Sequence, residues 1–371
     1  MNNNSPVRIL QVLGELNTGG AESLVMNVYR NIDRNLIQFD FVVHGINIGF
    51  YENEIKKLGG RVFHISKYKG INHFKYVKEW ENFFRVHSEY KIIHSHIRST
   101  ASLLLKVAKK YNLITICHSH NTSNGKGISS IVKKIYQKNI PKYADYLYAC
   151  SKESAIWLYG EELANSKKCI IFNNAIDSDR YIYNSNIRAK VRESLNIDKR
   201  IVLGQVGRLT EQKNYFFSLK LLHELVNINS KYILLIIGVG PLKEKIVNYI
   251  NNNNLNDYVI ILENRSDVNE LMQAMDTFIM PSLWEGLPLS LVEAQAASLP
   301  CIISNHVTDG IIIKEKVKTL SLDFIDTWIN TIEKIRKIDI RVNESKRIKE
   351  SGFSIQQNTE LLCDFYLKLL K

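Results

Sequence analysis

Short apolar runs alternate with helix-like segments along this 371-residue chain. Polar residues gather where the apolar runs end, as they do at the carboxyl edge of a parallel sheet. The alternation predicts an α/β fold with doubly wound parallel sheets and a site at that edge. The expected strands are Val7–Leu13, Phe39–His44, Val62–Ile65, Lys91–His96, Leu113–His118, Tyr146–Ser151, Ile170–Asn174, Ile201–Gly207, Tyr232–Gly238, Val259–Leu262, Thr277–Met280 and Cys301–Ile303.

The chain is too long for one hydrophobic core, so two domains are expected. Between Ala175 and Lys199 the sequence becomes polar and irregular, with one short helix, before the alternation restarts at Ile201. We therefore expect the linker between the domains near residues 175 to 187.

Composition restricts the function classes. The net charge of +12 and the isoelectric point near 9.2 favour an anionic partner, either nucleic acid, an acidic membrane surface or a phosphorylated ligand. The N-terminus lacks the pattern of a signal peptide and no apolar run is long enough to span a bilayer, so we expect a cytoplasmic protein. The five cysteines are widely spaced, which favours reduced thiols over disulfides or a zinc site.

Residues 280 to 304 predict a strand, a turn, a helix opened by Pro288, and a second strand. A helix that opens from a strand end presents free N–H groups to a phosphate. Glu285 in the turn and Glu293 in the helix would then accept hydrogen bonds from hydroxyls at either end of a ligand with an anionic middle. A sugar–diphosphate–nucleoside has this layout, although the pair alone is more typical of a solvated loop glutamate and a charge in a helix turn.

Two further turns suit a phosphorylated ligand. Gly19 and Gly20 lie between a strand and a helix and allow close backbone approach, although a plain tight turn would look the same. Arg208 and Lys213 bracket another strand-to-helix turn, where two cations could hold a diphosphate from separate directions.

Two His-Ser-His triplets, at residues 94 to 96 and 118 to 120, end neighbouring predicted strands. Histidines two apart share one face of a strand, so a metal site is one interpretation. No carboxylate or cysteine cluster accompanies them, which favours packing and capping roles, with one histidine of the second triplet facing the substrate.

A basic amphipathic helix is predicted from Gly127 to Tyr143. Its isoleucines recur at helical spacing, while Lys133, Lys134 and Lys138 supply charge. Such a helix could rest on an anionic membrane surface, or it could pack on the core with a solvated lysine face.

Taken together, the motifs resemble those of a known family. Gly207-Arg208-Leu209 with Lys213, Gly238-Val239-Gly240, the run from Arg265 to Val268, and Glu285-Gly286-Leu287-Pro288 with Glu293 match in order and spacing the group 1 family of retaining, nucleotide-sugar-dependent glycosyltransferases. The N-terminal Gly14–Glu22 and His118–Thr122 stretches resemble the subset that builds bacterial exopolysaccharide and capsule.

This resemblance implies a GT-B fold, with two Rossmann-like domains facing across a cleft. An acceptor-binding domain of residues 1–180 would be joined by a returning C-terminal helix, residues 355–371. Residues 181–354 would form the nucleotide-sugar-binding domain. The apolar stripe of the returning helix is expected at Leu361, Leu362, Phe365, Leu369 and Leu370. A hinge between the domains could close over the donor and exclude water.

The resemblance also implies residue roles. Arg208 and Lys213 would bind the diphosphate and neutralise the leaving group in place of a metal, so no metal or other cofactor is expected. Glu285 would hold the sugar hydroxyls and Glu293 the ribose. The remaining donor residues implied are Gly19, Gly20, Gly238, Arg265, Val268, Gly286, Leu287, Pro288 and Leu289. His120 would be the histidine at the sugar, with His118 as the alternative and Asn121 beside them. The family often has glycine near Glu263 or Asn264, so this chain departs from the pattern at the base pocket.

The function implied is transfer of a hexose or N-acetylhexosamine from a UDP-sugar to a saccharide acceptor, either lipid-linked or soluble. A nucleotide-sugar epimerase shares the architecture, but it would act without an acceptor. A nucleic-acid-binding protein would explain the charge, yet the lysines scatter over both halves without a recognised motif. A dehydrogenase is disfavoured, because the turn at Gly238 lacks the third glycine of a dinucleotide fingerprint.

Overall fold

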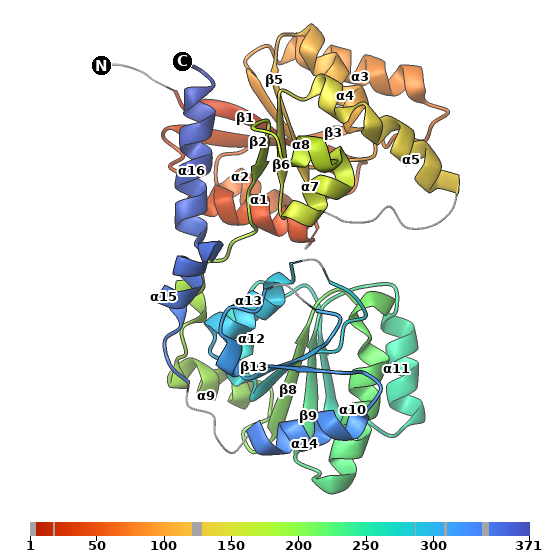
Figure 1. Ribbon diagram of the computed structural model, residues 1–371, viewed down its shortest axis with the longest axis vertical. Coiled ribbons are helices and arrows are strands. Elements are labelled where there is room, and N and C mark those ends of the chain that lie inside the picture. Colours follow the sequence, from red (N-terminus) through yellow and green to blue (C-terminus); the bar gives the residue numbers. More distant parts are fainter. Residues whose placement is uncertain (1–4, 18, 121–127, 286, 308–309, 336–340) are drawn as a thin grey trace. The chain divides into compact units, whose positions relative to one another are not determined.

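The computed structural model describes residues 5–17, 19–120, 128–285, 287–307, 310–335 and 341–371, except for the side chains of residues 128 to 132. The chain forms two compact units. Unit 1 contains residues 1–175 and 355–371, and unit 2 contains residues 176–354 (Figure 1). The units divide between Ala175 and Ile176, five residues before the boundary at 180/181 expected from the sequence.

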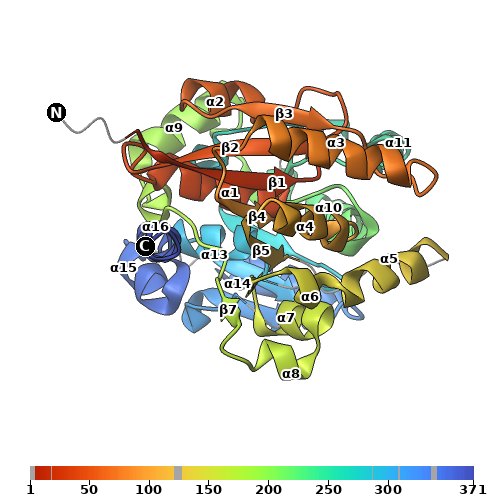
Figure 2. The same cartoon turned by 90° about the horizontal axis from the view of Figure 1, so that it is seen from above.

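Unit 1 is built on a seven-stranded parallel sheet with the order β3-β2-β1-β4-β5-β6-β7, of which the strands from β3 to β5 can be followed in Figure 2. Its five inner strands are almost wholly buried, as expected for a parallel sheet covered on both faces, while the edge strands β3 and β7 are partly exposed. They are β1 (Val7–Leu13), β2 (Ile37–His44), β3 (Val62–Ile65), β4 (Ile92–Ser95), β5 (Ile114–Ser119), β6 (Tyr146–Ala149) and β7 (Cys169–Ile171).

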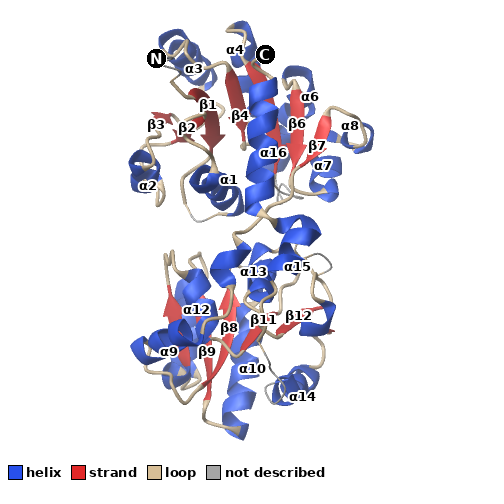
Figure 3. Ribbon diagram, turned by 90° about the vertical axis from the view of Figure 1, so that its left-hand side faces the viewer, coloured by secondary structure: helices blue, strands red, loops and turns tan. Residues whose placement is uncertain are grey.

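Helices cover both faces of this sheet (Figures 1 and 3). One buried cluster holds residues of α3, α4, α6, α7 and α8, and the other holds residues of α1, α2 and α16. The helices are α1 (Gly20–Asn31), α2 (Glu52–Lys57), α3 (His73–Val86), α4 (Ala101–Lys110), α5 (Ile128–Lys138), α6 (Ile140–Tyr143), α7 (Lys152–Tyr159), α8 (Glu161–Ala164) and α16 (Ile355–Lys368). The single basic helix predicted over 127 to 143 is thus two helices, α5 and α6, and the second has proline in its first turn.

The C-terminal helix α16 belongs to unit 1, although it follows unit 2 in the chain. Its buried face is formed by Ile355, Thr359, Leu362 and Tyr366. The predicted stripe was wrong at Leu361, which is 66% exposed, and it omitted Tyr366, which is fully buried. A tyrosine suits this position because its hydroxyl meets polar groups of β1 and β4.

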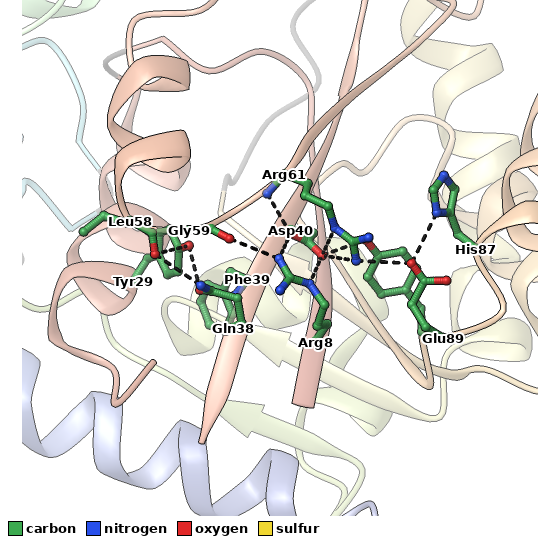
Figure 4. A network of polar contacts seen from close by, with 11 residues as sticks. Arg8, Tyr29, Gln38, Phe39, Asp40, Leu58, Gly59, Arg61, His87 and Glu89 are labelled. Atoms are coloured by element: carbon green, nitrogen blue, oxygen red, sulfur yellow. Dashed lines mark hydrogen bonds and ion pairs between the residues drawn. The ribbon is translucent and has the colours of Figure 1, made fainter. Parts of the chain in front are cut away.

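Asp40 is a fully buried carboxylate near the start of the unit 1 strands (Figure 4). Burial alone would raise its pKa, but hydrogen bonds from Arg8, Arg61 and Tyr90 hold the pKa below its ordinary value. Both arginines bind it at 2.5 to 2.8 Å. The network joins β1, β2 and the segments before β3 and β4, so it fixes the strands at the edge opposite the predicted site.

Unit 2 has a six-stranded parallel sheet with the order β10-β9-β8-β11-β12-β13. At Gly204, in the middle of β8, any side chain would collide with Met275, so the close packing there needs glycine. The strand β13 was missed by the sequence analysis because its exposed lysine and threonine break the apolar run. The strands are β8 (Ile201–Val206), β9 (Tyr232–Ile237), β10 (Val259–Leu262), β11 (Thr277–Met280), β12 (Cys301–Ser304) and β13 (Val317–Leu320).

The unit 2 helices also lie on both faces of their sheet and contribute to two buried clusters. They are α9 (Ser185–Ser194), α10 (Tyr215–Ile228), α11 (Lys243–Asn252), α12 (Val268–Ala274), α13 (Leu289–Ala296), α14 (Ile325–Ile335) and α15 (Ser345–Ile348), with short turns η1 (Ser178–Tyr181), η2 (Glu211–Lys213), η3 (Asn256–Tyr258), η4 (Lys314–Lys316) and η5 (Lys349–Phe353). Within the described part of the chain, no helix has the length and apolar character that crossing a bilayer requires.

Candidate active site

The strand order of unit 2 places two loops of the predicted site together. β8 and β11 are neighbours at the centre of the sheet, while the strands that follow each of them lie on opposite sides. Ligands of open α/β sheets bind outside the carboxyl ends of the strands at such a switch point. Here the loop after β8 carries Arg208 and Lys213, and the loop after β11 carries Glu285.

Lys213 and Glu285 form an ion pair across these loops. The Lys213 Nζ lies 2.6 Å from Glu285 Oε1, and the two side chains are only 14% and 6% exposed. Gln212 donates from Nε2 to the other carboxylate oxygen of Glu285 at 3.2 Å. A cation and a carboxylate held side by side are suited to a ligand that presents a phosphate next to hydroxyl groups.

The turn that carries Lys213 is anchored by polar groups of its own unit. Gln205, buried within β8, donates to the Lys213 carbonyl at 2.7 Å and accepts from the Ser218 hydroxyl at 2.6 Å. Tyr215 donates to the Gly207 carbonyl at 2.7 Å. These bonds fix the backbone on both sides of Arg208, whose own side chain is exposed and reaches solvent.

Gly238 and Gly240 lie beside this turn at the end of β9. A Cβ on Gly238 would be 1.9 Å from the Gly207 carbonyl oxygen, and one on Gly240 would be 2.4 Å from that of Leu209. Only glycine permits this approach, so the two glycines set the shape of the loop around Arg208.

Glu293 lies in α13, which begins at Leu289 with Pro288 as its N-cap. Burial raises the pKa of Glu293 to about 7, and a hydrogen bond from Tyr181 opposes part of that rise. Tyr181 belongs to η1, in the irregular stretch that offered no sequence signal for a site residue. The Leu287 and Leu289 side chains are partly buried, and Gly286 lies outside the described residues.

The predicted base-pocket residues lie at the end of β10. Arg265 is exposed and paired with Asp267, with 2.7 Å between the arginine Nε and the carboxylate. Val268 is the first residue of α12 and packs on the unit 2 core. Arg265 is therefore tied back to its own loop rather than to Lys213 or Glu285.

Unit 1 has its own switch point, between β1 and β4. Gly19 is the N-cap of α1 and Gly20 is its first residue. A Cβ built on Gly20 meets nothing within 4 Å, so the backbone at the start of α1 is open to a ligand. At Gly19 a Cβ would meet the Glu22 carboxylate.

The two His-Ser-His triplets converge at the carboxyl ends of β4 and β5. His94 and His118 are buried, and the rings of His118 and His120 stack at 4.1 Å. His96 lies 2.9 Å from both Gln11 Oε1 and His120 Nε2, and His94 lies 2.6 Å from the Tyr366 hydroxyl. Both nitrogens of His118 and the Nδ1 of His120 have no hydrogen-bond partner among the described residues.

Burial lowers the pKa of His94 and His120 to about 3, and it lowers the pKa of His96 and His118 as well. Ligand atoms of His94, His96 and His118 lie within 4.8 Å of one another. A metal must lie near the plane of each imidazole that binds it, but His94 is inclined by only 18° to His96 and 19° to His118. Because the His94 ring is stacked on the other two, its nitrogen lone pairs lie in a plane beside theirs, and the rings would have to turn to hold an ion.

The first strand of each unit contains one buried polar residue whose role was not predicted from the sequence. Gln11 lies in β1 beside His96, and Gln205 lies in β8 beneath Lys213. A glutamine inside an otherwise apolar strand was the available signal, since a buried amide needs partners. Asn121 lies outside the described residues. Lys134 and Lys138 are exposed on α5, and Lys133 is partly exposed.

Residues 187–353 match the family of glycosyl transferases group 1, and residues 18–180 match glycosyltransferase family 4. The putative glycosyltransferase EpsF of Bacillus subtilis is 32% identical over 98% of this chain and 97% of its own length. The chain belongs to the group 1 glycosyltransferases.

Two other proteins extend the comparison of this group 1 glycosyltransferase. It is 26% identical, over 76% of both chains, to the Escherichia coli UDP-Gal:alpha-D-GlcNAc-diphosphoundecaprenol alpha-1,3-galactosyltransferase. The Anabaena Alr3699/HepE crystal structure, in complex with UDP and glucose, matches 96% of this chain and 98% of that chain at a TM-score of 0.74 and 17% identity. Together with the two parallel sheets, this similarity confirms the GT-B fold.

Proposed function

We propose that this glycosyltransferase moves a hexose or N-acetylhexosamine from a UDP-sugar to a lipid-linked saccharide during exopolysaccharide or capsule synthesis, with retention of the anomeric configuration. The observation that carries the proposal is the Lys213–Glu285 ion pair at the switch point of unit 2. It places a phosphate-binding cation and a hydroxyl-binding carboxylate next to each other, beside the exposed Arg208.

Donor binding would exchange the partners of this pair. Lys213 would turn from Glu285 to the diphosphate, and the freed carboxylate would accept hydrogen bonds from the sugar hydroxyls. Arg208 would bind the diphosphate from the other side, so that two cations neutralise the leaving group without a metal ion. Glu293 would hold the ribose, and Arg265 and Val268 the base. Support for a UDP-sugar comes from the names of the galactosyltransferase relative and the UDP-bound structure.

Unit 1 would supply the acceptor side. His120 is the proposed partner of the transferred sugar, since its Nδ1 has no hydrogen-bond partner in the described structure while its Nε2 is fixed by His96. Gly20 offers open backbone at the start of α1. A lipid-linked acceptor is supported by the name of the galactosyltransferase relative, whose acceptor is diphosphoundecaprenol-linked. The enzyme would then work at an anionic membrane surface, which suits its charge of +12.

The test is to measure UDP release and sugar transfer with a panel of UDP-sugars and a lipid-linked acceptor. Lys213→Ala should lower the transfer rate by about a hundredfold or more, because it removes charge stabilisation at the leaving group. Lys109→Ala is the matched control, because Lys109 forms a similar pair with Asp145 at 2.8 Å on the surface of unit 1, among residues with no assigned role in the site. It should leave transfer unchanged.

Glu285→Gln should also reduce transfer, since an amide replaces the carboxylate that accepts from the sugar. Equal transfer by the Lys213 variant and the wild type would overturn the assigned roles. Donor incubated without acceptor should remain unchanged, whereas its isomerisation would indicate an epimerase instead.

A further inference from the structure

Two large apolar side chains stand out from the surface of unit 1. Ile71 is 96% exposed and Phe74 is 87% exposed. They lie in the loop after β3 and in the first turn of α3, three residues apart. Folding gains nothing from exposing such side chains, and both are available to a partner.

Lysines surround these two side chains. Lys69, Lys75 and Lys78 are exposed, and no aspartate or glutamate occurs between Lys67 and Lys78. Lys67 is paired with Glu15 at 2.5 Å, and Lys75 lies 3.9 Å from Glu79. The apolar tip therefore rises from a surface of net positive charge.

The patch continues onto α5. The Tyr68 hydroxyl lies 2.7 Å from that of Tyr136, so the loop before α3 packs directly on this helix. Next to Tyr136, Ile135 is 59% exposed, and Lys134 and Lys138 lie on the exposed part of α5. The whole stretch from residue 90 to residue 144 contains no acidic residue.

We infer that Ile71 and Phe74 insert into the acyl region of an anionic membrane, while the lysines of α3 and α5 bind its phosphate headgroups. Apolar tips ringed by lysines match the layering of a bilayer interface, where aliphatic groups enter the hydrocarbon and ammonium groups stay at headgroup level. Nucleic acid would satisfy the lysines but would leave the isoleucine in water. The sequence indicated docking through the basic amphipathic helix that carries Lys133, Lys134 and Lys138, whereas the structure adds a separate apolar anchor.

This inference rests on the proposed function only for its purpose, which is to bring the enzyme to a lipid-linked acceptor. It can be tested without donor or acceptor. The full-length protein is sedimented with phosphatidylcholine vesicles that contain phosphatidylglycerol, and with vesicles of phosphatidylcholine alone. Binding should need the anionic lipid and should weaken as salt is raised.

Ile71→Ser with Phe74→Ser should reduce binding to the anionic vesicles by at least about tenfold, because two inserted apolar side chains are lost. Val86→Ser is the matched control, since Val86 is 70% exposed at the other end of α3, about 18 Å along the helix axis from Phe74. It should bind as the wild type does. In Phe74→Trp, the indole emission should shift to the blue on vesicle addition.

Wild-type binding by the Ile71/Phe74 variant, or an unshifted indole emission, would overturn the insertion. Transfer to a soluble acceptor should be the same in this variant as in the wild type. If the wild type itself transfers no sugar to a soluble acceptor, that result counts against the proposed function and not against the membrane contact. Binding to oligonucleotides in preference to vesicles would also contradict the inference.

Discussion

At the scale of single residues, Glu293 shows how burial can prepare a binding group. Its carboxyl group is close to half-protonated at neutral pH, since burial raises its pKa to about 7. The empty protein is thereby destabilised once the group ionises, because the native state holds a proton that the unfolded chain releases near pH 4.5. A ligand hydroxyl that donates to the carboxylate would offset this cost.

We therefore predict that the affinity for a UDP-sugar rises with pH through about 7, by up to tenfold per pH unit below that value. Glu293→Gln should remove this dependence and weaken donor binding at pH 8. It should also make the empty protein more stable at pH 8, by roughly 1 to 3 kcal/mol, because no charge is then buried. Calorimetric titration and urea unfolding across the pH range measure the two effects. Donor affinity that is flat in the wild type would contradict the assigned role.

Sequence reasoning found the charged residues at this scale but not their partners. Lys213, Glu285 and Glu293 stood out through their spacing, because they follow strand ends at motif positions. Tyr181 could not be predicted, since its contact with Glu293 depends on how the irregular segment after Ala175 folds back on α13. Long-range pairing of this kind leaves no periodic trace in the sequence.

At the scale of elements, the parallel strands were predictable and their neighbours in space were not. Continuous apolar runs marked all but β13, whose Lys318 and Thr319 face solvent. The basic segment near residue 130 was predicted as one helix and is two. The convergence of β4 and β5, which brings four histidines together, follows from the strand order and could not be read from either triplet alone.

These histidines predict acid sensitivity. The pKa values of His94 and His120 fall from 6.5 in the unfolded chain to about 3, so both rings stay neutral in the folded protein as the pH drops. Above pH 6.5 these rings are neutral in both states and the free energy of unfolding does not depend on them. Below pH 6.5 the unfolded chain takes up protons that the folded protein does not, so the folded protein loses stability. The groups that face them are His96, His118, Arg98, Tyr148 and Tyr366, none of which is acidic.

We predict that the free energy of unfolding falls by about 2 kcal/mol for each of these two histidines as the pH is lowered from 8 to 5. Urea titrations at several pH values, followed by a probe in unit 1, measure this slope. His120→Gln should reduce it, while His223→Gln, on the surface of unit 2, should not. An unchanged slope in the His120 variant would contradict the prediction.

At the scale of the whole molecule, the sequence indicated two domains, and the structure has two compact units of similar design. Unit 1 is discontinuous, because residues 355–371 return to it after unit 2 is complete. The first and last residues of unit 2 lie side by side. The Ile176 N–H donates to the Phe353 carbonyl at 3.1 Å, and Ile176 pairs with Ser354 in a parallel bridge.

In a chain truncated after Ser354, we expect unit 1 to be unfolded and unit 2 to remain folded. The deletion removes Ile355, Leu362 and Tyr366 from the core of unit 1, which amounts to roughly 6 kcal/mol of apolar burial and is comparable to the total stability of a domain. Limited proteolysis with mass spectrometry should then recover a protected fragment from unit 2 alone. The full-length Leu361→Ala variant is the control, since this side chain lies on the exposed face of the same helix. A protected unit 1 fragment from the truncated chain would contradict the prediction.

The late position of α16 has a consequence for biosynthesis. Ribosomes elongate at about 5 to 20 residues per second, so roughly 10 to 40 seconds pass between translation of residue 175 and translation of residue 371. During that interval the apolar surface around Phe39 of β2 lacks the cover that α16 later provides, and unit 2 can fold first. Unit 1 would then complete its folding after unit 2, although most of it is synthesised first, and chaperones would bind unit 1 before α16 is made.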